Sequence, residues 1–266
     1  MKKLWTGLRI ALNNAWRYWP LLMNLVGRDL KKKYRSSFLG YVWCVLNPLL
    51  IMIIMTVVFS RMFRNSIENY PIYFFTGRML YVFVTQGAGS VMKSIVGNGA
   101  LMRKTRVPYY MFPLSAFFSA LIDFLFTLVA FAIVMIFTGT SVSVHLIAFP
   151  MVIVETGLFT FGFGLLLAIA NIYFRDTGYL YNAFSIAWMY LTPLFYPMTN
   201  LPETVRMIVA RFNPLYYYVE QTRTIFLDHL WPNQMTVLKG FGVGIVLFAL
   251  GLMAYNKVKK DMILYI

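Results

Sequence analysis

Charged residues are scarce in this chain of 266 residues. Aspartate, glutamate, lysine and arginine together make up 12% of the sequence, whereas 60% is apolar and the mean hydropathy is +0.67. Soluble globular domains carry about twice that share of charged residues. The composition therefore excludes an ordinary soluble domain and predicts an integral membrane protein.

Acidic residues are the scarcer of the two kinds of charge. Nine aspartates and glutamates face 24 lysines and arginines, so the formal net charge is +15. A basic chain binds nucleic acid when its cations cover one face of a polar domain. Here the cations flank apolar runs, which is the arrangement of cytoplasmic loops in membrane proteins. We interpret them as topology signals and expect no nucleic-acid partner.

Residue types that build catalytic or metal sites are also few. The single cysteine, Cys44, lies inside an apolar run and excludes an intramolecular disulfide. The two histidines, His145 and His229, belong to no metal-binding spacing such as HExxH. The segment GNGALMRKT has Arg103 where a Walker motif requires glycine, and no strand precedes it. We therefore expect no catalytic residue, no metal and no cofactor in this chain.

Long apolar runs are what the sequence has in quantity. A helix needs about 20 residues to cross the hydrocarbon core of a bilayer. Six runs approach or exceed that length: residues 42–60, 71–92, 109–137, 146–172, 179–196 and 235–255. The glycine pairs and triplets within them, such as Gly162 and Gly164, indicate close helix packing.

The connecting segments complete the predicted architecture. Residues 1–41 would form a cytoplasmic, amphipathic segment at the membrane interface, with Pro20 ending its first helix. Residues 93–108 would form a second cytoplasmic segment. Residues 197–234 contain four prolines and two amphipathic pieces, which predict an outer re-entrant pair of short helices. The fold class is thus an all-α integral membrane protein with six transmembrane helices in a single transmembrane domain, residues 1–266.

The distribution of cations predicts the orientation of the chain. With the N-terminus inside, nine cations lie before residue 42, four lie in residues 93–106, one is Arg175 and three lie in residues 257–260. The other seven of the 24 lie in outer segments or inside spans. Because an excess of lysine and arginine marks the cytoplasmic side, both termini are predicted to be cytoplasmic.

Three charged residues fall within the predicted spans. Each costs about 2.5–3.5 kcal/mol at the bilayer centre on insertion scales, so such residues usually face the bundle or a cavity. Arg78 would either extend toward the outer surface or contact an anionic substrate. Asp123 and Glu155 would either make packed polar contacts or form a proton relay. A proton-coupled carrier usually has discontinuous helices in matching halves, a pattern that this sequence does not show.

The fifth run is rich in aromatic residues, namely Tyr179, Tyr181, Phe184, Trp188, Tyr190, Phe195 and Tyr196. Rings near the ends of a span are typical of the aromatic belts at membrane interfaces. Trp188 and Tyr190 lie deeper, where flat rings would suit a wall along which a sugar chain slides. The belt, lipid contact and sugar contact all remain open as interpretations.

Three stretches carry a resemblance to a known family: RDLKKKYRSSFLGYVWCVLNPLL at 28–50, NIYFRDTGYLYNAFSIAWMYLTPLFYP at 171–197 and LPETVRMIVARFNPLYYYVEQTR at 201–223. In this order and at this spacing they resemble the permease subunits of polysaccharide ABC exporters of the ABC-2 type, which export O-antigen (a part of lipopolysaccharide), capsule or teichoic acid. The resemblance covers nearly the whole chain. It implies a homodimer paired with two copies of a separate cytoplasmic ATPase, which would bind ATP and magnesium. It also implies export of a lipid-linked polysaccharide, carried on undecaprenyl diphosphate, across the bacterial plasma membrane.

The resemblance also implies roles for individual residues. Those coupling the chain to the ATPase would be Ile95, Val96, Gly97, Asn98, Leu101, Met102, Arg103 and Lys104. Those receiving the lipid head group would be Lys31, Lys32, Lys33, Arg35, Leu39 and Gly40, the cations attracting its diphosphate. The channel would be lined by Trp43, Arg78, Trp188, Tyr190, Phe195 and Tyr196. The outer gate would contain Glu203, Arg206, Arg211, Asn213 and Pro214. Arg78 departs from the family pattern, because the family commonly has an apolar residue at this position.

Three other functions are alternatives to polysaccharide export. A membrane-embedded enzyme that modifies glycans or lipids would need a polar catalytic cluster, which the sequence lacks. A secondary carrier would use Asp123 and Glu155 and would be independent of ATP. An ABC exporter of another lipid or of a drug would differ only in its substrate.

Overall fold

The structure is a computed structural model that describes residues 2–35, 39–62, 67–104, 107–259 and 261–262. All regular elements in these ranges are helices, which confirms the predicted all-α class. Five of them are long and apolar enough to cross a membrane. They are α2 (Val42–Phe59), α3 (Tyr70–Gly97), α5 (Met111–Thr138), α6 (Phe149–Tyr173) and α10 (Gln234–Val258).

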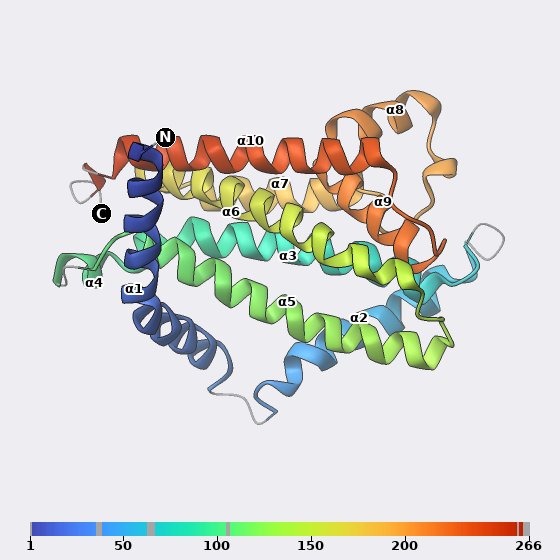
Figure 1. The fold of residues 1–266 in the computed structure, drawn as a ribbon. Coiled ribbons are helices and arrows are strands. Elements are labelled where there is room, and N and C mark those ends of the chain that lie inside the picture. The colour runs from blue at the N-terminus through green and yellow to red at the C-terminus, as the bar shows by residue number, and fades with distance from the viewer. Residues whose placement is uncertain (1, 36–38, 63–66, 105–106, 260, 263–266) are drawn as a thin grey trace.

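The long helices form a bundle with α3 at its centre. α3 packs against both α5 and α6, and α10 packs against the other side of α6 (Figure 1). The core between them contains fully buried large side chains, among them Phe74, Leu80 and Phe159. This core holds the central helices in fixed register, whereas α2 lies at the edge of the bundle with most of its surface uncovered.

Glycines set the separation between α6 and α10. A Cβ atom on Gly251 would lie 2.6 Å from the carbonyl oxygen of Gly162, and a Cβ on Gly162 would collide with the backbone of Phe248. Side chains at these positions would push the two helices apart. The glycines of these spans therefore serve close helix packing, as the sequence predicts.

The helix α7 (Thr177–Leu191) corrects one predicted boundary. The fifth run was expected to be helical to residue 196, but α7 ends at Leu191, where Thr192 adopts an extended conformation. Pro193 explains this end, because a proline disfavours the helical conformation of the residue before it. With 15 residues α7 is about 22 Å long, which is shorter than the hydrocarbon core. The count of six spans therefore stays a prediction.

The N-terminal helix α1 (Lys2–Tyr34) corrects the predicted helix end at Pro20. Pro20 lies inside this helix and does not end it. The helix instead changes direction along its length: its first part runs across one end of the bundle, roughly perpendicular to the long helices (Figure 1). A proline inside a helix removes one hydrogen bond and commonly causes such a bend. Leu22, Leu25 and Val26 are buried against α5 and its neighbours, which attaches α1 to the bundle.

The two ends of the bundle differ in their elements. The short helix α4 (Gly99–Lys104) lies at the same end as the start of α1 and the end of α10, and we call this the α4 end (Figure 1). The opposite end, the α8 end, carries η1 (Val144–Ala148), η2 (Met198–Asn200), α8 (Glu203–Phe212) and α9 (Pro214–Phe226). The helix pair expected within residues 197–234 is thus present, and its re-entrant position in a membrane stays a prediction.

Candidate functional site

One face of α3 carries several polar residues along its length. Its members follow one another at intervals of three or four residues, so they share one side of the helix: Arg78, Val82, Gln86, Ser90, Lys93 and Gly97. In a span that is otherwise apolar, such a face requires polar neighbours or a cavity. This periodicity is present in the sequence, but the charged residues taken singly do not reveal it.

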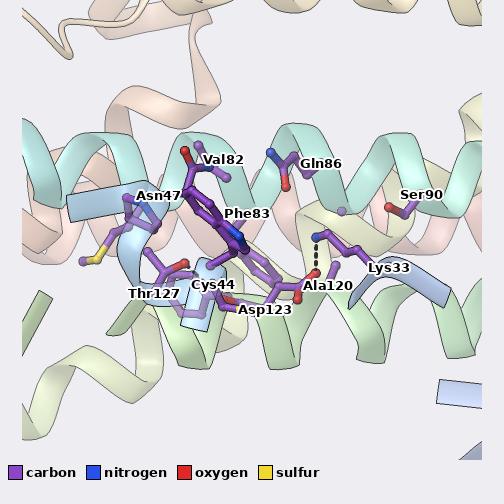
Figure 2. Close-up of a pocket in the computed structure, with 15 residues that line it drawn as sticks. Lys33, Cys44, Asn47, Val82, Phe83, Gln86, Ser90, Ala120, Asp123 and Thr127 are labelled. Carbon is purple, nitrogen blue, oxygen red and sulfur yellow. Dashed lines mark hydrogen bonds and ion pairs between the residues drawn. The ribbon is translucent and has the colours of Figure 1, made fainter. Parts of the chain in front are cut away.

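This face borders three adjoining cavities between α2, α3 and α5. The central cavity has a volume of about 370 Å³, and its polar lining includes Lys33, Asn47, Gln86, Ser90, Asp123 and Thr127 (Figure 2). A wider cavity of about 590 Å³ shares Lys33, Ser90 and Asp123 with it and continues toward the α4 end. A small one of about 50 Å³ shares Asn47, Gln86 and Thr127 and extends to Arg78. We call the three together the α3 groove.

An ion pair crosses the middle of the groove. Lys33, near the end of α1, donates to Oδ2 of Asp123 on α5 at 2.8 Å (Figure 2). The two side chains are 49% and 23% exposed, so water partly screens the pair. Asp123 thus makes a packed polar contact, one of the two interpretations that the sequence left open.

Glu155 lies elsewhere and does not join Asp123. It is completely buried on α6, where its Oε2 would lie 2.5 Å from a Cβ added to Gly240 of α10. Gln221 of α9 lies against the same glycine. Glu155 lines none of the groove cavities that contain Asp123. The structure therefore does not bring the two carboxylates together as a proton relay requires.

Arg78 lies at the far end of the groove from Lys93. Its nearest aromatic ring is that of Phe74, whose centroid is 5.9 Å from the guanidinium carbon. Within the part of the chain that the structure describes, no hydrogen bond or ion pair reaches its guanidinium. Arg78 therefore faces the groove with all five of its N–H donors unpaired by the described residues.

The residues expected to couple to an ATPase lie together at the α4 end. Ile95, Val96 and Gly97 finish α3, Asn98 caps it, and the others belong to α4. Arg103 and Lys104 are exposed, whereas Ile95 and Met102 are buried in the core. The amide of Asn98 accepts a hydrogen bond from Arg28 at 2.9 Å. This bond connects α1 to the predicted coupling segment.

The residues expected to receive a lipid head group lie where α1 ends. Lys31, Lys32 and Arg35 line an open cavity of about 1080 Å³ together with Arg28 and Tyr41. Leu39 is exposed, and Gly40 has a φ of 48°, which confirms a bend that favours glycine. Lys33 differs from its neighbours, because its ammonium pairs with Asp123 in the α3 groove. Residues 36–38 lie outside the described part of the chain.

The expected channel-lining residues do not share one surface. Trp43 is exposed and lines the α3 groove, Arg78 lies in the same groove, and Tyr190 is exposed on α7. Trp188 and Phe195 are only 6% and 8% exposed, and both belong to the hydrophobic core. In a single copy of the chain their rings thus pack within the core, and their role as lining residues of a channel stays a prediction. Tyr196 is half-buried and donates to the carbonyl of Tyr190.

Asn213 connects the α8–α9 pair to α7. Its Oδ1 accepts from the indole nitrogen of Trp188 at 2.9 Å and from the backbone nitrogen of Leu215 at 3.1 Å. Its Nδ2 donates to Oγ1 of Thr192 at 2.9 Å. Asn213 thereby caps α9, which begins at Pro214, and fixes the end of α7. The other expected gate residues, Glu203, Arg206 and Arg211, are exposed on α8.

The sequence analysis missed Arg223, which is buried on α9. Its Nη2 donates to the carbonyl oxygens of Pro193 at 2.7 Å and Tyr73 at 3.3 Å, and its guanidinium stacks 3.5 Å from the Tyr73 ring. These contacts join α9 to α3 and to the segment after α7. Burial raises the pKa of the nearby Glu220 carboxyl, and the charge of Arg223 opposes that rise. A single buried arginine in an amphipathic helix gives no sequence signal that distinguishes it from an exposed one.

Comparisons with known proteins identify relatives that match most of the chain. The family model described as "ABC-2 type transporter" matches residues 20–227. The O-antigen export system permease protein RfbA of Myxococcus xanthus is 29% identical over 237 residues, which cover 89% of this chain and 91% of that protein. RfbA of Klebsiella pneumoniae is 29% identical over 240 residues, or 90% and 92% of the two chains. The capsule polysaccharide export inner-membrane protein CtrC of Neisseria meningitidis is 23% identical over 203 residues, or 75% and 76%.

Proposed function

Because this chain belongs to the ABC-2 type transporter family, we propose that it is the membrane-spanning subunit of an ATP-driven polysaccharide exporter. It would move a lipid-linked glycan, of the O-antigen, capsule or teichoic-acid kind, across the bacterial plasma membrane. The observation that carries this proposal is the set of polysaccharide export permeases that resemble the chain over three quarters or more of its length. A chain that matches such permeases over most of both lengths is expected to share their transport role.

The energy for transport would come from a separate ATPase. This chain has neither a Walker motif nor a strand to carry one within the described ranges. The α4 end supplies a surface on which an ATPase would dock, with Arg103 and Lys104 exposed at its tip. The bond between Arg28 and Asn98 would pass a movement of this segment to α1. ATP and magnesium would bind in the partner, and this chain would carry no catalytic residue.

Two copies of the chain would enclose the channel. α2 and α7 each expose a broad apolar and aromatic face, which includes Ile54, Val57, Tyr179, Phe184 and Tyr190. The tyrosine hydroxyls on α7 suit a surface that contacts water or sugar hydroxyls better than one that contacts lipid tails alone. A homodimer that pairs these faces would place α2 and α7 of both copies along the path of the glycan.

The cations indicate which end faces the cytoplasm. Most of the described cations lie at the α4 end or on α1, including Lys31, Lys93, Arg103, Arg175 and Lys257. The positive-inside rule assigns such an end to the cytoplasm, where an ATPase would find ATP. Both termini would then be cytoplasmic, and α8 and α9 would form the outer gate.

The proposal is tested by complex formation with a polysaccharide-exporter ATPase from the same genome. The two proteins are co-expressed with an affinity tag on this chain, and the purified complex is assayed for ATP hydrolysis. We expect a stable complex that contains equal numbers of both subunits and hydrolyses ATP. Failure to bind any such ATPase, with this chain correctly inserted in the membrane, would overturn the proposal.

A further inference from the structure

We propose that the α3 groove binds the phosphate or diphosphate head group of a lipid, with Arg78 as its innermost ligand. The groove lies behind α2 on one chain, apart from the exposed faces of α2 and α7. The identification of this lipid as the carrier of the exported glycan rests on the proposed function. The binding of a lipid phosphate as such rests on the groove alone.

The wide mouth of the groove attracts anions. Four cations line it, namely Arg28, Lys32, Lys33 and Lys93, against two carboxylates, Asp29 and Asp123. Each carboxylate is already paired, Asp29 with Arg28 and Asp123 with Lys33, both at 2.8 Å. Lys32 and Lys93 are exposed and add a net positive field at the mouth. Clefts lined by one sign of charge raise the local concentration of the opposite ion.

The middle of the groove offers neutral hydrogen-bond donors. Gln86 and Ser90 of α3 lie around the same space as the ion pair of Lys33 and Asp123, and Asn47 lines it from α2 (Figure 2). Thr127 of α5 also lines this space, but its hydroxyl already donates to the carbonyl oxygen of Asp123 at 3.0 Å. Amide and hydroxyl groups donate to phosphate oxygens. Phe83, Phe124 and Trp43 provide apolar walls in the same cavity. A phosphate attached to a hydrocarbon chain would find partners for both of its parts here.

Arg78 gives the strongest indication of an anionic ligand. A guanidinium within a span usually pairs with an acid or with backbone carbonyls. The two acidic residues of the groove, Asp29 and Asp123, pair with Arg28 and Lys33 instead, and no described residue bonds to Arg78. Arg78 is half-buried, and a partly desolvated charge without a partner is unfavourable. An arginine binds phosphate through two parallel hydrogen bonds. An incoming phosphate would therefore satisfy a group that the chain leaves unpaired.

The ion pair between Lys33 and Asp123 would regulate access. A phosphate that reaches the middle of the groove competes with Asp123 for the Lys33 ammonium. Replacing Asp123 by asparagine leaves the shape almost unchanged and removes the competitor. The groove should then bind phosphate more tightly, whereas a variant that merely damaged the fold would bind it more weakly.

The test measures binding of farnesyl diphosphate to the purified complex of this chain and its ATPase in a maltoside detergent, which carries no phosphate. Farnesol, which lacks the diphosphate, is the control ligand. We expect Arg78→Gln to weaken binding about tenfold or more, Arg78→Lys to weaken it less, and Asp123→Asn to strengthen it several-fold. Lys239→Gln, which also removes one cation near the start of a span but outside the groove, is the matched control and should bind like the wild type.

The outcomes separate the possibilities. Equal affinity of the wild type and Arg78→Gln for farnesyl diphosphate would overturn the proposal, as would equal binding of farnesol. If Arg78→Gln does not fold, two other variants test the proposal. Gln86→Leu must weaken binding of farnesyl diphosphate, and Asp123→Asn must strengthen it. Competition by phosphatidic acid at equal concentration would identify an ordinary anionic lipid as the source of the phosphate, and its absence would identify the polyprenyl carrier. If wild-type chain and ATPase export glycan while all variants bind alike, the groove proposal fails and the exporter function stands.

Discussion

Lys33 of α1 and Asp123 of α5 form an ion pair of 2.8 Å across 90 residues of sequence. The pair connects the end of α1 to the middle of α5. It also divides the α3 groove between its wide mouth at the α4 end and the narrow part that leads to Arg78.

Exchanging the two charges of this ion pair should preserve the thermal stability that reversing only one of them removes. Lys33→Asp or Asp123→Lys alone places like charges together and should lower the midpoint of thermal unfolding. The double variant restores an ion pair and should recover most of the loss. Since the pair is partly exposed, we expect a coupling energy of about 0.5–1 kcal/mol. A thermal double-mutant cycle on the purified protein measures it, and a coupling energy of zero would contradict the contact.

Asn213→Ala should destabilise the helix pair α8–α9. The change removes the cap of α9 and leaves the buried indole N–H of Trp188 without its acceptor. Loss of a cap costs about 1 kcal/mol and an unsatisfied buried donor about 1–3 kcal/mol. We therefore expect a loss of about 2–4 kcal/mol, measured by thermal unfolding.

Trp188→Phe is the control for this prediction, because it removes the donor and part of the indole but leaves Asn213, the cap of α9, and an aromatic ring in the core. It should cost less than Asn213→Ala. If the two variants were equally stable, Asn213 would have no role in capping α9 beyond its bond to Trp188.

Gly251→Val should separate α6 from α10. A Cβ at this position meets the carbonyl oxygen of Gly162 at 2.6 Å, so the helices must move apart. Overpacking of this kind costs about 1–3 kcal/mol. Gly242→Val, on the same helix, is the matched control, since nothing lies within 4 Å of its Cβ position. Thermal unfolding of both variants measures the difference, and equal stability would contradict the close packing.

Arg103→Glu combined with Lys104→Glu should dissociate the ATPase or uncouple it from transport. Both side chains are exposed on α4, so the fold and membrane insertion should be unaffected. Co-purification of the ATPase and its rate of ATP hydrolysis measure the effect. Lys257→Glu combined with Lys259→Glu removes two exposed cations near the end of α10, at the α4 end, and serves as the control. Normal association and export in the α4 variant would contradict the coupling role.

The sequence predicted the spans well because hydropathy reports burial in lipid one segment at a time. It predicted α2, α3, α5, α6 and α10, and it predicted a pair of short helices after α7. It placed the end of α7 five residues too late, since the aromatic run continues past Pro193 without a change in hydropathy. It also ended α1 at Pro20, because the packing of Leu22 and Leu25 that keeps the helix intact is a tertiary contact.

The candidate site was less predictable than the spans. The pairing of Lys33 with Asp123 depends on how α1 crosses the bundle, which no local pattern encodes. Trp188 and Tyr190 are two residues apart and equally aromatic, yet one is buried and the other exposed, because only Trp188 faces the core. The polar face of α3 could have been found from its periodicity, but the neighbours that make it a groove could not.

The measurement that tests the central claim most directly is transport in proteoliposomes. The chain and its ATPase are reconstituted with a fluorescent lipid-linked glycan, and glycan that crosses the bilayer is detected by an enzyme that can reach only the far side. We predict transport that requires ATP, magnesium and both proteins, and that stops when the ATPase loses its catalytic glutamate. Transport by this chain without the ATPase, or no transport by the intact and ATP-hydrolysing complex, would contradict its role as the membrane subunit of a polysaccharide exporter.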